Sequence, residues 1–345
     1  MKKGVKNLLL LLSSIAFSSA LIGCNEKSEV INDNLNEIKF GVSVYEKSDI
    51  FISKIVDNLE ESLNTIEEES NLEIDLTVLD AGGNQYNQNE QVDEFISQGV
   101  DVLCINLVDR RSASYIINKA KSFDIPVIFF NREPVEEDMN MWDKVYYVGA
   151  KAEQSGIMQA DIVLDIYEED NRKVDKNGDG KIQYLMLEGE AGHQDTSIRT
   201  EYCIKRLKDK GVKVEKLDSD VANWNRELGM EKMENWIKKY KNNIEVVFSN
   251  NDAMALGAID AMKNLNVKNM PIVVGVDGID EAMEEIKRGN MTGTVLSDSK
   301  KQGESIVDIA YELAINGDSK ILNRKYTREG HSKVTIENLN EFINK

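Results

Sequence analysis

Short apolar runs alternate with amphipathic segments along the chain from residue 38 onward. Continuous apolar runs predict buried strands, whereas apolar positions three or four residues apart predict helices with one buried face. The predicted strands are residues 38–45, 72–79, 102–107, 126–131, 182–187, 212–217, 246–249 and 272–276. The predicted helices are residues 49–69, 87–97, 113–123, 153–167, 224–240, 253–265 and 279–287. This alternation predicts an α/β fold of doubly wound parallel sheets with helices on both faces.

The size and composition of the chain favour two packed domains. Its 345 residues exceed the ~250–300 that a single hydrophobic core usually serves. Hydrophobic residues at 41% and charged residues at 30%, with only 3 prolines, are typical of an ordered, water-soluble chain. The 42 Lys and Arg against 61 Asp and Glu give a net charge of −19, and no basic stripe interrupts this acidity. Such a chain is not expected to bind nucleic acid.

Only the N-terminus departs from this acidic, soluble pattern. Lys2, Lys3 and Lys6 precede an apolar run at residues 8–12. The pattern predicts a secretory signal over residues 1–23, because the run is shorter than the ~20 apolar residues of a membrane-spanning helix. A buried N-terminal helix is the alternative. The polar residues 24–37 are expected to form a flexible leash.

Residues 21–24, with the sequence Leu-Ile-Gly-Cys, resemble the lipobox of bacterial lipoproteins. The resemblance implies that Cys24 is lipidated and becomes the first residue of an extracytoplasmic protein. Such a protein is attached to the cell membrane only through its lipid. Cys104 and Cys203 remain, and each is interpreted as a small core residue. A disulfide between them stays open at this point, because sequence alone does not give the geometry of a bridge.

Polar side chains follow almost every predicted strand at the point where it ends. In parallel sheets, the carboxyl ends of the strands form the edge where ligands bind. The polar residues at these ends include Asp49, Asn106, Asn131, His193, Asp195, Asn251, Asp277 and Ser297. A simpler explanation covers part of the set, since Asn, Asp and Ser are favoured N-caps of helices.

Aromatic and cationic side chains accompany these residues and point to a sugar. Phe51, Arg199 and Trp224 lie beside them in the sequence. Aromatic rings cover the C–H faces of a pyranose, while carboxylates, amides and guanidinium groups pair with its hydroxyls. His193 is interpreted as a further hydrogen-bond donor, because neither a second nearby histidine for a metal nor a Gly-x-Ser-x-Gly elbow accompanies it. The alternative for His193 is a loop histidine satisfied within the protein.

A calcium-loop spacing occurs at residues 175–183. Side-chain oxygens stand at its positions 1, 3, 5 and 9, a glycine at position 6 and a backbone carbonyl at position 7. The residues with these oxygens are Asp175, Asn177, Asp179, Lys181 and Gln183. Position 12 is Met186, so the loop is not an EF-hand, and the missing carboxylate would come from elsewhere, with Glu245 as a candidate. An Asx-rich turn without a metal is the alternative.

These features together resemble the galactose/glucose-binding proteins of bacterial sugar uptake, within the ribose- and galactose-type periplasmic binding family. The similar strings lie at residues 41–45, 105–109, 146–149 and 249–255, and the likeness extends over residues 38–345. It implies a type I fold of two lobes joined by three crossovers, near residues 125–126, 296–297 and 326–328. One lobe would comprise residues 38–126 and 298–328, and the other residues 127–297 and 329–345 with the calcium loop. The lobes would close on the sugar by a hinge motion.

The resemblance also implies roles for individual residues. Phe51 and Trp224 would sandwich the pyranose. The residues implied to bond its hydroxyls are Asp49, Asn106, His193, Asp195, Arg199, Asn251 and Asp277, with Asp49 at the hydroxyl that separates glucose from galactose. Ser297 stands where the family has a ligand-binding asparagine, which leaves the sugar preference open. The implied ligands of a structural Ca²⁺ are Asp175, Asn177, Asp179, Gln183, bidentate Glu245 and the Lys181 carbonyl.

The implied function is the capture of D-galactose or D-glucose and its delivery to a membrane ABC permease by a monomeric protein. A chemoreceptor is a possible second partner, and ribose or another hexose is the alternative ligand. A sugar-responsive transcription regulator shares the fold but would carry a basic helix-turn-helix before the first strand. A glycosidase would need a catalytic pair of carboxylates. Asp49, Asp195 and Asp277 are instead interpreted as sugar-binding, so the protein is not expected to be an enzyme.

Overall fold

The computed structural model describes residues 37–317 and 325–343. They belong to one compact unit, Asn34–Lys345. Neither of these two ranges contains a helix that is long and apolar enough to cross a membrane. The predicted signal at residues 1–23, the predicted lipidation of Cys24 and all but the last residue of the predicted leash lie outside the described residues.

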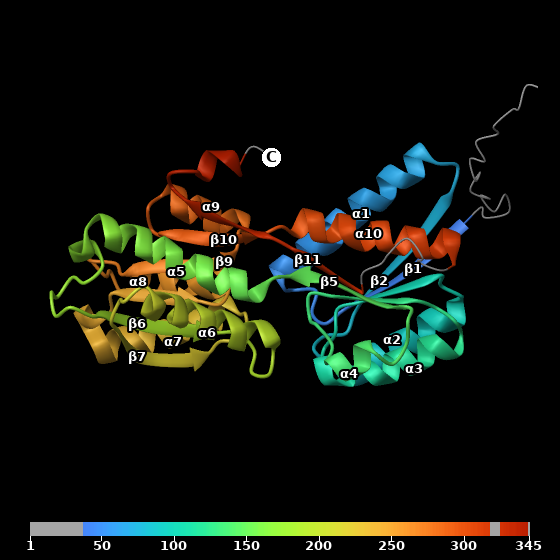
Figure 1. The fold of residues 1–345 in the computed structure, drawn as a ribbon, viewed down its shortest axis with the longest axis horizontal. Coiled ribbons are helices and arrows are strands. Elements are labelled where there is room, and N and C mark those ends of the chain that lie inside the picture. The colour runs from blue at the N-terminus through green and yellow to red at the C-terminus, as the bar shows by residue number, and fades with distance from the viewer. Residues whose placement is uncertain (1–36, 318–324, 344–345) are drawn as a thin grey trace, which may run out of the picture. The chain divides into compact units, whose positions relative to one another are not determined.

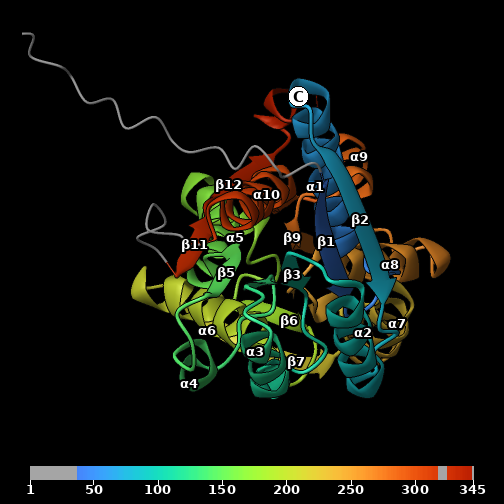
Figure 2. The same ribbon diagram turned by 90° about the vertical axis from the view of Figure 1, so that its right-hand side faces the viewer.

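The first of two six-stranded sheets is entirely parallel, with the strand order β11-β5-β4-β3-β1-β2. Its strands are β1 (Glu37–Val44), β2 (Glu73–Asp80), β3 (Val102–Ile105), β4 (Val127–Phe130), β5 (Val145–Ala150) and β11 (Tyr326–Glu329). One face is covered by α1 (Ile50–Glu69) and α10 (Ser299–Asn316), and the other by α2 (Gln85–Gln98), α3 (Ala113–Ser122) and α4 (Glu136–Met139) (Figure 1). We call this sheet and its helices the first lobe. Strand β2 lies at its edge beside β1 (Figure 2).

The second sheet has the order β12-β10-β9-β8-β6-β7 and is parallel except for β12, which runs antiparallel to β10. Its strands are β6 (Ile182–Glu188), β7 (Val214–Val221), β8 (Val246–Ser249), β9 (Ile272–Asp277), β10 (Gly293–Ser297) and β12 (His331–Thr335). One face is covered by α5 (Ala152–Glu169) and α6 (Gln194–Asp209), and the other by α7 (Arg226–Tyr240), α8 (Asp252–Asn264) and α9 (Asp280–Lys287). We call this assembly the second lobe. Short 3₁₀ helices are η1 (Arg110–Ser112), η2 (Asn171–Lys173), η3 (Lys241–Asn243) and η4 (Leu339–Glu341).

The burial of the strands follows from their place in the sheets. All residues of the central strands β3, β4, β8 and β9 are buried, whereas the edge strand β2 has no buried residue. A central parallel strand is covered by helices on both faces, so its sequence is a continuous apolar run, and such runs made these strands predictable. The architecture of two doubly wound α/β sheets confirms the predicted fold class.

The first crossover between the lobes differs from the prediction. The boundary expected after residue 126 is wrong, because β4 pairs with β3 and β5 pairs with β4 in the first sheet. The chain leaves the first lobe only at Lys151, between β5 and α5. No strand was predicted at β5 (Val145–Ala150), and the crossover near residues 125–126 was implied by the family resemblance. The other two connections lie at Asp298, between β10 and α10, and at Gly330, between β11 and β12.

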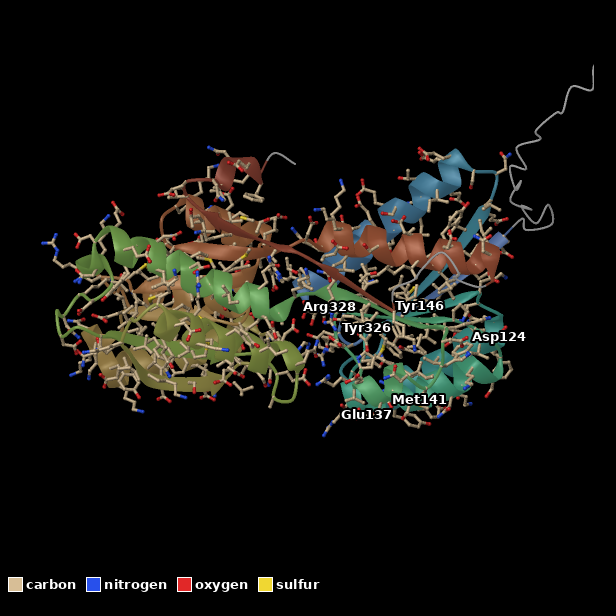
Figure 3. The ribbon with its side chains drawn as sticks, in the orientation of Figure 1. Asp124, Glu137, Met141, Tyr146, Tyr326 and Arg328 are labelled. Carbon is tan, nitrogen blue, oxygen red and sulfur yellow. The ribbon has the colours of Figure 1, made fainter. Side chains whose placement is uncertain are left out.

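Strand β11 is bound to the first lobe by aromatic and charged contacts as well as by its ladder. The Tyr326 ring lies edge-on to Tyr147, with centroids 6.2 Å apart. The Arg328 guanidinium lies 5.1 Å from the Tyr326 ring centroid (Figure 3). It also forms a 2.7 Å ion pair with Glu133. These contacts hold β11 in place just before the chain crosses to β12.

Candidate ligand-binding site

An inner cavity lies between the carboxyl ends of the strands of the two lobes. The first lobe supplies Tyr45, Asp49, Phe51, Ile52, Asn131 and Arg132, and the second supplies His193, Asp195, Arg199, Trp224, Asn251 and Asp277. The cavity has a volume of about 30 Å³ and shares walls with an outer cavity of about 1060 Å³. Eight of the ten predicted ligand residues are therefore brought together here. Tyr45, Ile52, Asn131 and Arg132 were not among those ten.

The remaining two predicted ligand residues lie behind the cavity wall. The Asn106 side chain is fully buried; its Oδ1 accepts from the Tyr45 N–H at 3.2 Å and its Nδ2 donates to the Phe130 carbonyl at 3.1 Å. It therefore joins the ends of β1 and β4. The buried Ser297 hydroxyl accepts from Gln302 Nε2 at 3.1 Å. Neither side chain lines the inner cavity.

The first-lobe wall is built on the N-cap of α1. Asp49 Oδ1 accepts from the backbone N–H groups of Phe51 and Ile52 at 2.9 and 3.1 Å. Its Oδ2 accepts from the Tyr45 hydroxyl at 2.6 Å. Burial and the neighbouring Asp49 raise the pKa of Tyr45, so its hydroxyl stays protonated and donates. Asp49 is thus fixed in orientation by neutral donors of its own lobe.

Arg132 is a cation of this wall that the sequence analysis missed. It follows β4 directly after Asn131, and its guanidinium carbon lies 3.6 Å from the centroid of the Tyr45 ring, a cation–π contact. Nη1 donates to the Val108 carbonyl at 2.8 Å. In the sequence, the only sign of this role is that Arg132 follows Asn131 at the end of a predicted strand. Arginine is not a favoured helix N-cap, so a search for capping residues after strands does not find it.

The second-lobe wall contains a buried charge network. Arg199 Nη2 lies 2.9 Å from Asp195 Oδ2, and Nη1 lies 3.9 Å from Asp277 Oδ1 and donates to the Asn250 carbonyl at 2.7 Å. Burial raises the pKa of Asp195, while Arg199 opposes that shift. Burial also raises the pKa of Asp277 well above its usual range, and Asp252 and the other nearby carboxylates add to the effect, again opposed by Arg199. The Arg199 guanidinium therefore favours the charged form of both carboxylates, whereas burial disfavours it.

His193 is held as a neutral donor. Its Nδ1 accepts from the Asp195 backbone N–H at 3.1 Å and caps α6. Burial, together with Arg132 and Arg199, lowers its pKa well below the usual value, so the ring is neutral at pH 7. With Nδ1 accepting, the proton lies on Nε2, which can donate to a ligand.

Trp224 presents its aromatic ring to the cavity because of its neighbours. The His193 ring lies edge-on to it at 5.1 Å between centroids. A Cβ at Gly189 would lie 2.1 Å from the indole ring, so the close approach of the ring requires glycine there. Asn251 Nδ2 donates to the Trp224 carbonyl at 3.2 Å, and its Oδ1 caps α8.

Backbone strain gathers at this cavity. Three lining residues other than glycine have positive φ: Asn131 at 59°, Trp224 at 64° and Asp277 at 123°. Such conformations cost about 1–3 kcal/mol each and persist where the surroundings impose them, commonly at ligand sites. The wall therefore holds these three residues in backbone conformations of higher energy.

The predicted calcium residues meet in one loop. Asp175 Oδ1 and Oδ2 accept from the N–H groups of Gly178 and Gly180, each at 2.8 Å. Glu245 reaches the loop from the start of β8 and accepts from the N–H of Lys176 at 2.6 Å and of Gln183 at 2.9 Å. Its side chain therefore lies beside the loop.

The amide side chains of the loop interlock with its acids. Asn177 Nδ2 donates to Gln183 Oε1, and Gln183 Nε2 donates to Asp179 Oδ2, both at 2.8 Å. The Lys181 ammonium turns outward to Glu215, so only its carbonyl is a candidate ligand. Within residues 37–317 and 325–343 there is no group of three or more His, Cys, Asp or Glu side chains placed to hold a metal ion. A Ca²⁺ bound here would therefore depend on amide and carbonyl oxygens in addition to individual carboxylates of the loop.

Cys104 and Cys203 are both buried and free. Burial raises the pKa of Cys104 to about 12, and it also raises the pKa of Cys203. Both are core residues, as predicted, and the disulfide left open by the sequence is not formed between them.

Two lobes that place polar and aromatic side chains around a cleft are typical of solute-binding domains. The chain belongs to the family of the periplasmic binding protein domain, which matches residues 40–318. Members of this family are solute-binding proteins rather than enzymes, and the family implies an extracytoplasmic location.

Individual relatives support this assignment. The chain is 37% identical to the D-galactose/methyl-galactoside binding periplasmic protein MglB of Haemophilus influenzae, over 96% of this chain and 98% of that protein. It is 27% identical to the ribose import binding protein RbsB of Bacillus subtilis, over 81% and 82%. An ABC transporter solute binding protein from Bacillus halodurans, solved with bound myo-inositol, matches with a TM-score of 0.75 and 29% identity, covering 90% of this chain and 98% of that one. The likeness to these proteins confirms the predicted type I fold.

Proposed function

We propose that this protein binds D-galactose or D-glucose between its two lobes and delivers the sugar to a membrane ABC permease. The observation that carries the proposal is the convergence of Asp49 and Phe51 from one lobe with Asp195, Arg199 and Trp224 from the other around one cavity. Fixed carboxylates and a guanidinium suit the hydroxyls of a neutral sugar, and the two aromatic residues suit its C–H faces. The likeness to a galactose-binding relative supports the choice of hexose.

A thermal-shift panel tests this proposal. A ligand that binds only the folded protein raises its melting temperature, and the rise grows with the logarithm of the ligand concentration once that concentration exceeds Kd. D-Galactose or D-glucose at millimolar concentration should raise the melting temperature by several degrees. Equal melting with and without both hexoses would contradict the assignment of the ligand.

Another polyhydroxy ligand is the alternative, with the same transport role. One relative is a ribose import binding protein, and another was solved with bound myo-inositol. Asn106 and Ser297, two residues expected to touch a hexose, lie behind the wall and satisfy protein groups instead. Including D-ribose and myo-inositol in the same panel separates this alternative from the hexose.

The mature protein is proposed to be a monomer, anchored to the outside of the cell membrane through a lipid on Cys24. The support is the lipobox-like sequence at residues 21–24, preceded by a signal-like segment. Mass spectrometry of the membrane fraction should find an N-terminal peptide that begins with lipidated Cys24, and Cys24→Ala should release the protein. A chemoreceptor is proposed as a second partner, to be tested by co-purification in the presence and absence of sugar.

We further propose a structural Ca²⁺ at the 175–183 loop. The support is donor chemistry: the loop holds the carboxylates of Asp175 and Asp179 and two amide side chains, and the residue Glu245 is 1% exposed and accepts from the N–H groups of Lys176, Asn177 and Gln183. A buried carboxylate of this kind is better compensated by a cation than by neutral donors alone. Chelation should lower the melting temperature by several degrees, and Asp179→Asn should remove that response. A melting temperature indifferent to chelation would mean that the loop is only a turn.

A further inference from the structure

Asp277 faces the inner cavity with little support for its own side chain. Within the described residues its carboxylate accepts no hydrogen bond, and its only ion pair is with Arg199 Nη1, 3.9 Å from Oδ1. By contrast, Asp49 accepts from three donors of the protein, and Asp195 lies 2.9 Å from Arg199. The position of the Asp277 carboxylate therefore depends mainly on its backbone.

The backbone at Asp277 has a conformation that residues other than glycine rarely adopt. Its φ is 123°, and that of the next residue, Gly278, is 74°. A Cβ at Gly278 would lie 3.0 Å from the Cα of Leu296 on the neighbouring strand β10, so the turn passes close to the sheet. Strained conformations of this kind persist only where the surrounding groups impose them.

Asp252 binds the turn that follows Asp277. Its Oδ2 accepts from the backbone N–H groups of Gly278 and Ile279 at 2.7 and 3.1 Å. Its Oδ1 accepts from the Thr294 hydroxyl at 2.6 Å, which fixes the orientation of the carboxylate. Asp252 is fully buried and lines neither the inner nor the outer cavity. A ligand in the cavity would therefore not touch it.

The helix that contains Asp252 does not account for these contacts. Asn251 already caps α8, so α8 does not need Asp252 as its cap. Helix α9, in contrast, follows Ile279, whose side chain accepts no capping hydrogen bond, and Asp252 supplies an acceptor there from a different helix. Strand β9 also leaves room for the carboxylate, because a Cβ at Gly275 would lie 2.1 Å from Asp252 Oδ1.

We propose that Asp252 is a positioning residue of the binding site, which holds the strained turn that directs the Asp277 carboxylate into the cavity. The inference rests on the proposed function, because its main consequence is a change in affinity for a hexose. A ligand binds more tightly to a carboxylate that is already ordered, since less conformational freedom is lost on binding. The second-lobe wall would thus depend on a residue outside the cavity.

The test is calorimetric titration of D-galactose and D-glucose. Asp252→Leu removes the acceptors at a similar side-chain size and should weaken binding about 10- to 100-fold, as expected when a hydrogen bond to a charged group is lost. Asp252→Asn keeps an acceptor for the two N–H groups and can donate to Thr294, so it should bind within about threefold of the unchanged protein. In an Asp277→Ala background, Asp252→Leu should cause no further loss, because Asp252 acts through Asp277.

A matched control separates positioning from stability. Glu285 is a buried carboxylate of the same lobe that accepts from the side chains of Lys263 and Asn290. It lines neither the inner nor the outer cavity. Glu285→Met should therefore lower the melting temperature, as Asp252→Leu does, but it should bind hexose as the unchanged protein does.

Two further measurements apply even if Asp252→Leu does not fold. Thr294→Val removes only the hydroxyl that donates to Oδ1 and should weaken binding about two- to tenfold, again not in an Asp277→Ala background. Without sugar, NMR should show faster hydrogen exchange of the Gly278 and Ile279 amides in Thr294→Val than in the unchanged protein. In Asp252→Asn their exchange should be unchanged.

The outcomes distinguish this inference from the proposed function. If the unchanged protein binds neither hexose, the proposed ligand is wrong, and amide exchange decides whether Asp252 holds the turn. If a folded Asp252→Leu binds hexose as tightly as the unchanged protein, or if its loss adds to that of Asp277→Ala, Asp252 does not position Asp277. Equal amide exchange in Thr294→Val and the unchanged protein would show that the oriented carboxylate does not hold the turn.

Discussion

The two walls of the cavity hold their carboxylates in different ways. In the second-lobe wall, Asp195 and Asp277 lie 2.9 and 3.9 Å from the buried Arg199 guanidinium. In the first-lobe wall, Asp49 is held by the Tyr45 hydroxyl and by two N–H groups of its own helix. The second wall therefore depends on a balance of buried charges, and the first depends on local backbone geometry. The two walls are therefore expected to differ in how much their carboxylates affect the stability of the protein.

The largest effect is expected from Arg199→Met. The substitution leaves Asp195 and Asp277 buried without their cation, and breaking a buried pair in this way costs about 3–5 kcal/mol. Chemical denaturation should show this loss, and hexose binding should fall at least 100-fold. Arg206→Met is the matched control, because Arg206 lies on the same helix in a 2.7 Å pair that is about one-third exposed. If Arg199→Met loses as little stability as Arg206→Met, the second-lobe wall does not depend on a balance of buried charges.

An intermediate effect on stability is expected when one aspartate of each wall is replaced by asparagine. Asp195→Asn takes the close carboxylate from Arg199 and should lower the free energy of unfolding by about 1–3 kcal/mol. Asp49→Asn keeps a good N-cap for α1 and should cost less than about 1 kcal/mol. Both variants should bind hexose more weakly. Equal losses of stability, measured by denaturation, would mean that the walls are held alike.

The last expected effect concerns the pH dependence of stability. Asp252 lies beneath the second-lobe wall, where its carboxylate accepts from the Thr294 hydroxyl and from the N–H groups of Gly278 and Ile279. Burial raises the pKa of Asp252 to about 7, opposed by these hydrogen bonds. The folded state then binds more protons than the unfolded state above about pH 4. The contribution of Asp252 to stability is therefore fully present below that pH and is lost as the pH rises through 7.

Asp252→Asn provides the measurement for this expectation. The amide keeps an acceptor for the two N–H groups and can donate to Thr294, but it does not titrate. The melting temperature of the unchanged protein should fall more between pH 5 and pH 8 than that of the variant. Parallel pH profiles for the two proteins would show that Asp252 does not titrate in this range.

The sequence predicted those residues of the cavity whose positions follow from the local connection between a strand and the next helix. Asp49, His193 and Asn251 follow strands and cap the helices that come next, so a strand end followed by a capping residue located them. Asp277 was located by the end of β9 alone. These positions depend on the strand-to-helix connection, which the apolar pattern reveals.

The remaining features depend on contacts between distant segments. Tyr45 and Arg132 line the cavity because the ends of β1 and β4 lie near each other in the sheet, which no local pattern records. Asn106 has the residue type and place of a ligand contact, but its side chain turns to the backbone of neighbouring strands. The crossover at Lys151 was not predicted, and the segment between β4 and β5 contains only the four-residue helix α4 rather than a long amphipathic helix.

The most direct test of the central claim is calorimetric titration of the purified, sugar-free protein with D-galactose, D-glucose, D-ribose and myo-inositol. The cavity geometry predicts one-to-one binding of galactose or glucose that is lost in Asp49→Ala and in Trp224→Ala, while both variants remain folded. Binding of ribose or myo-inositol with no heat from either hexose would contradict the proposed ligand. Hexose binding that survives both substitutions would contradict the proposed site.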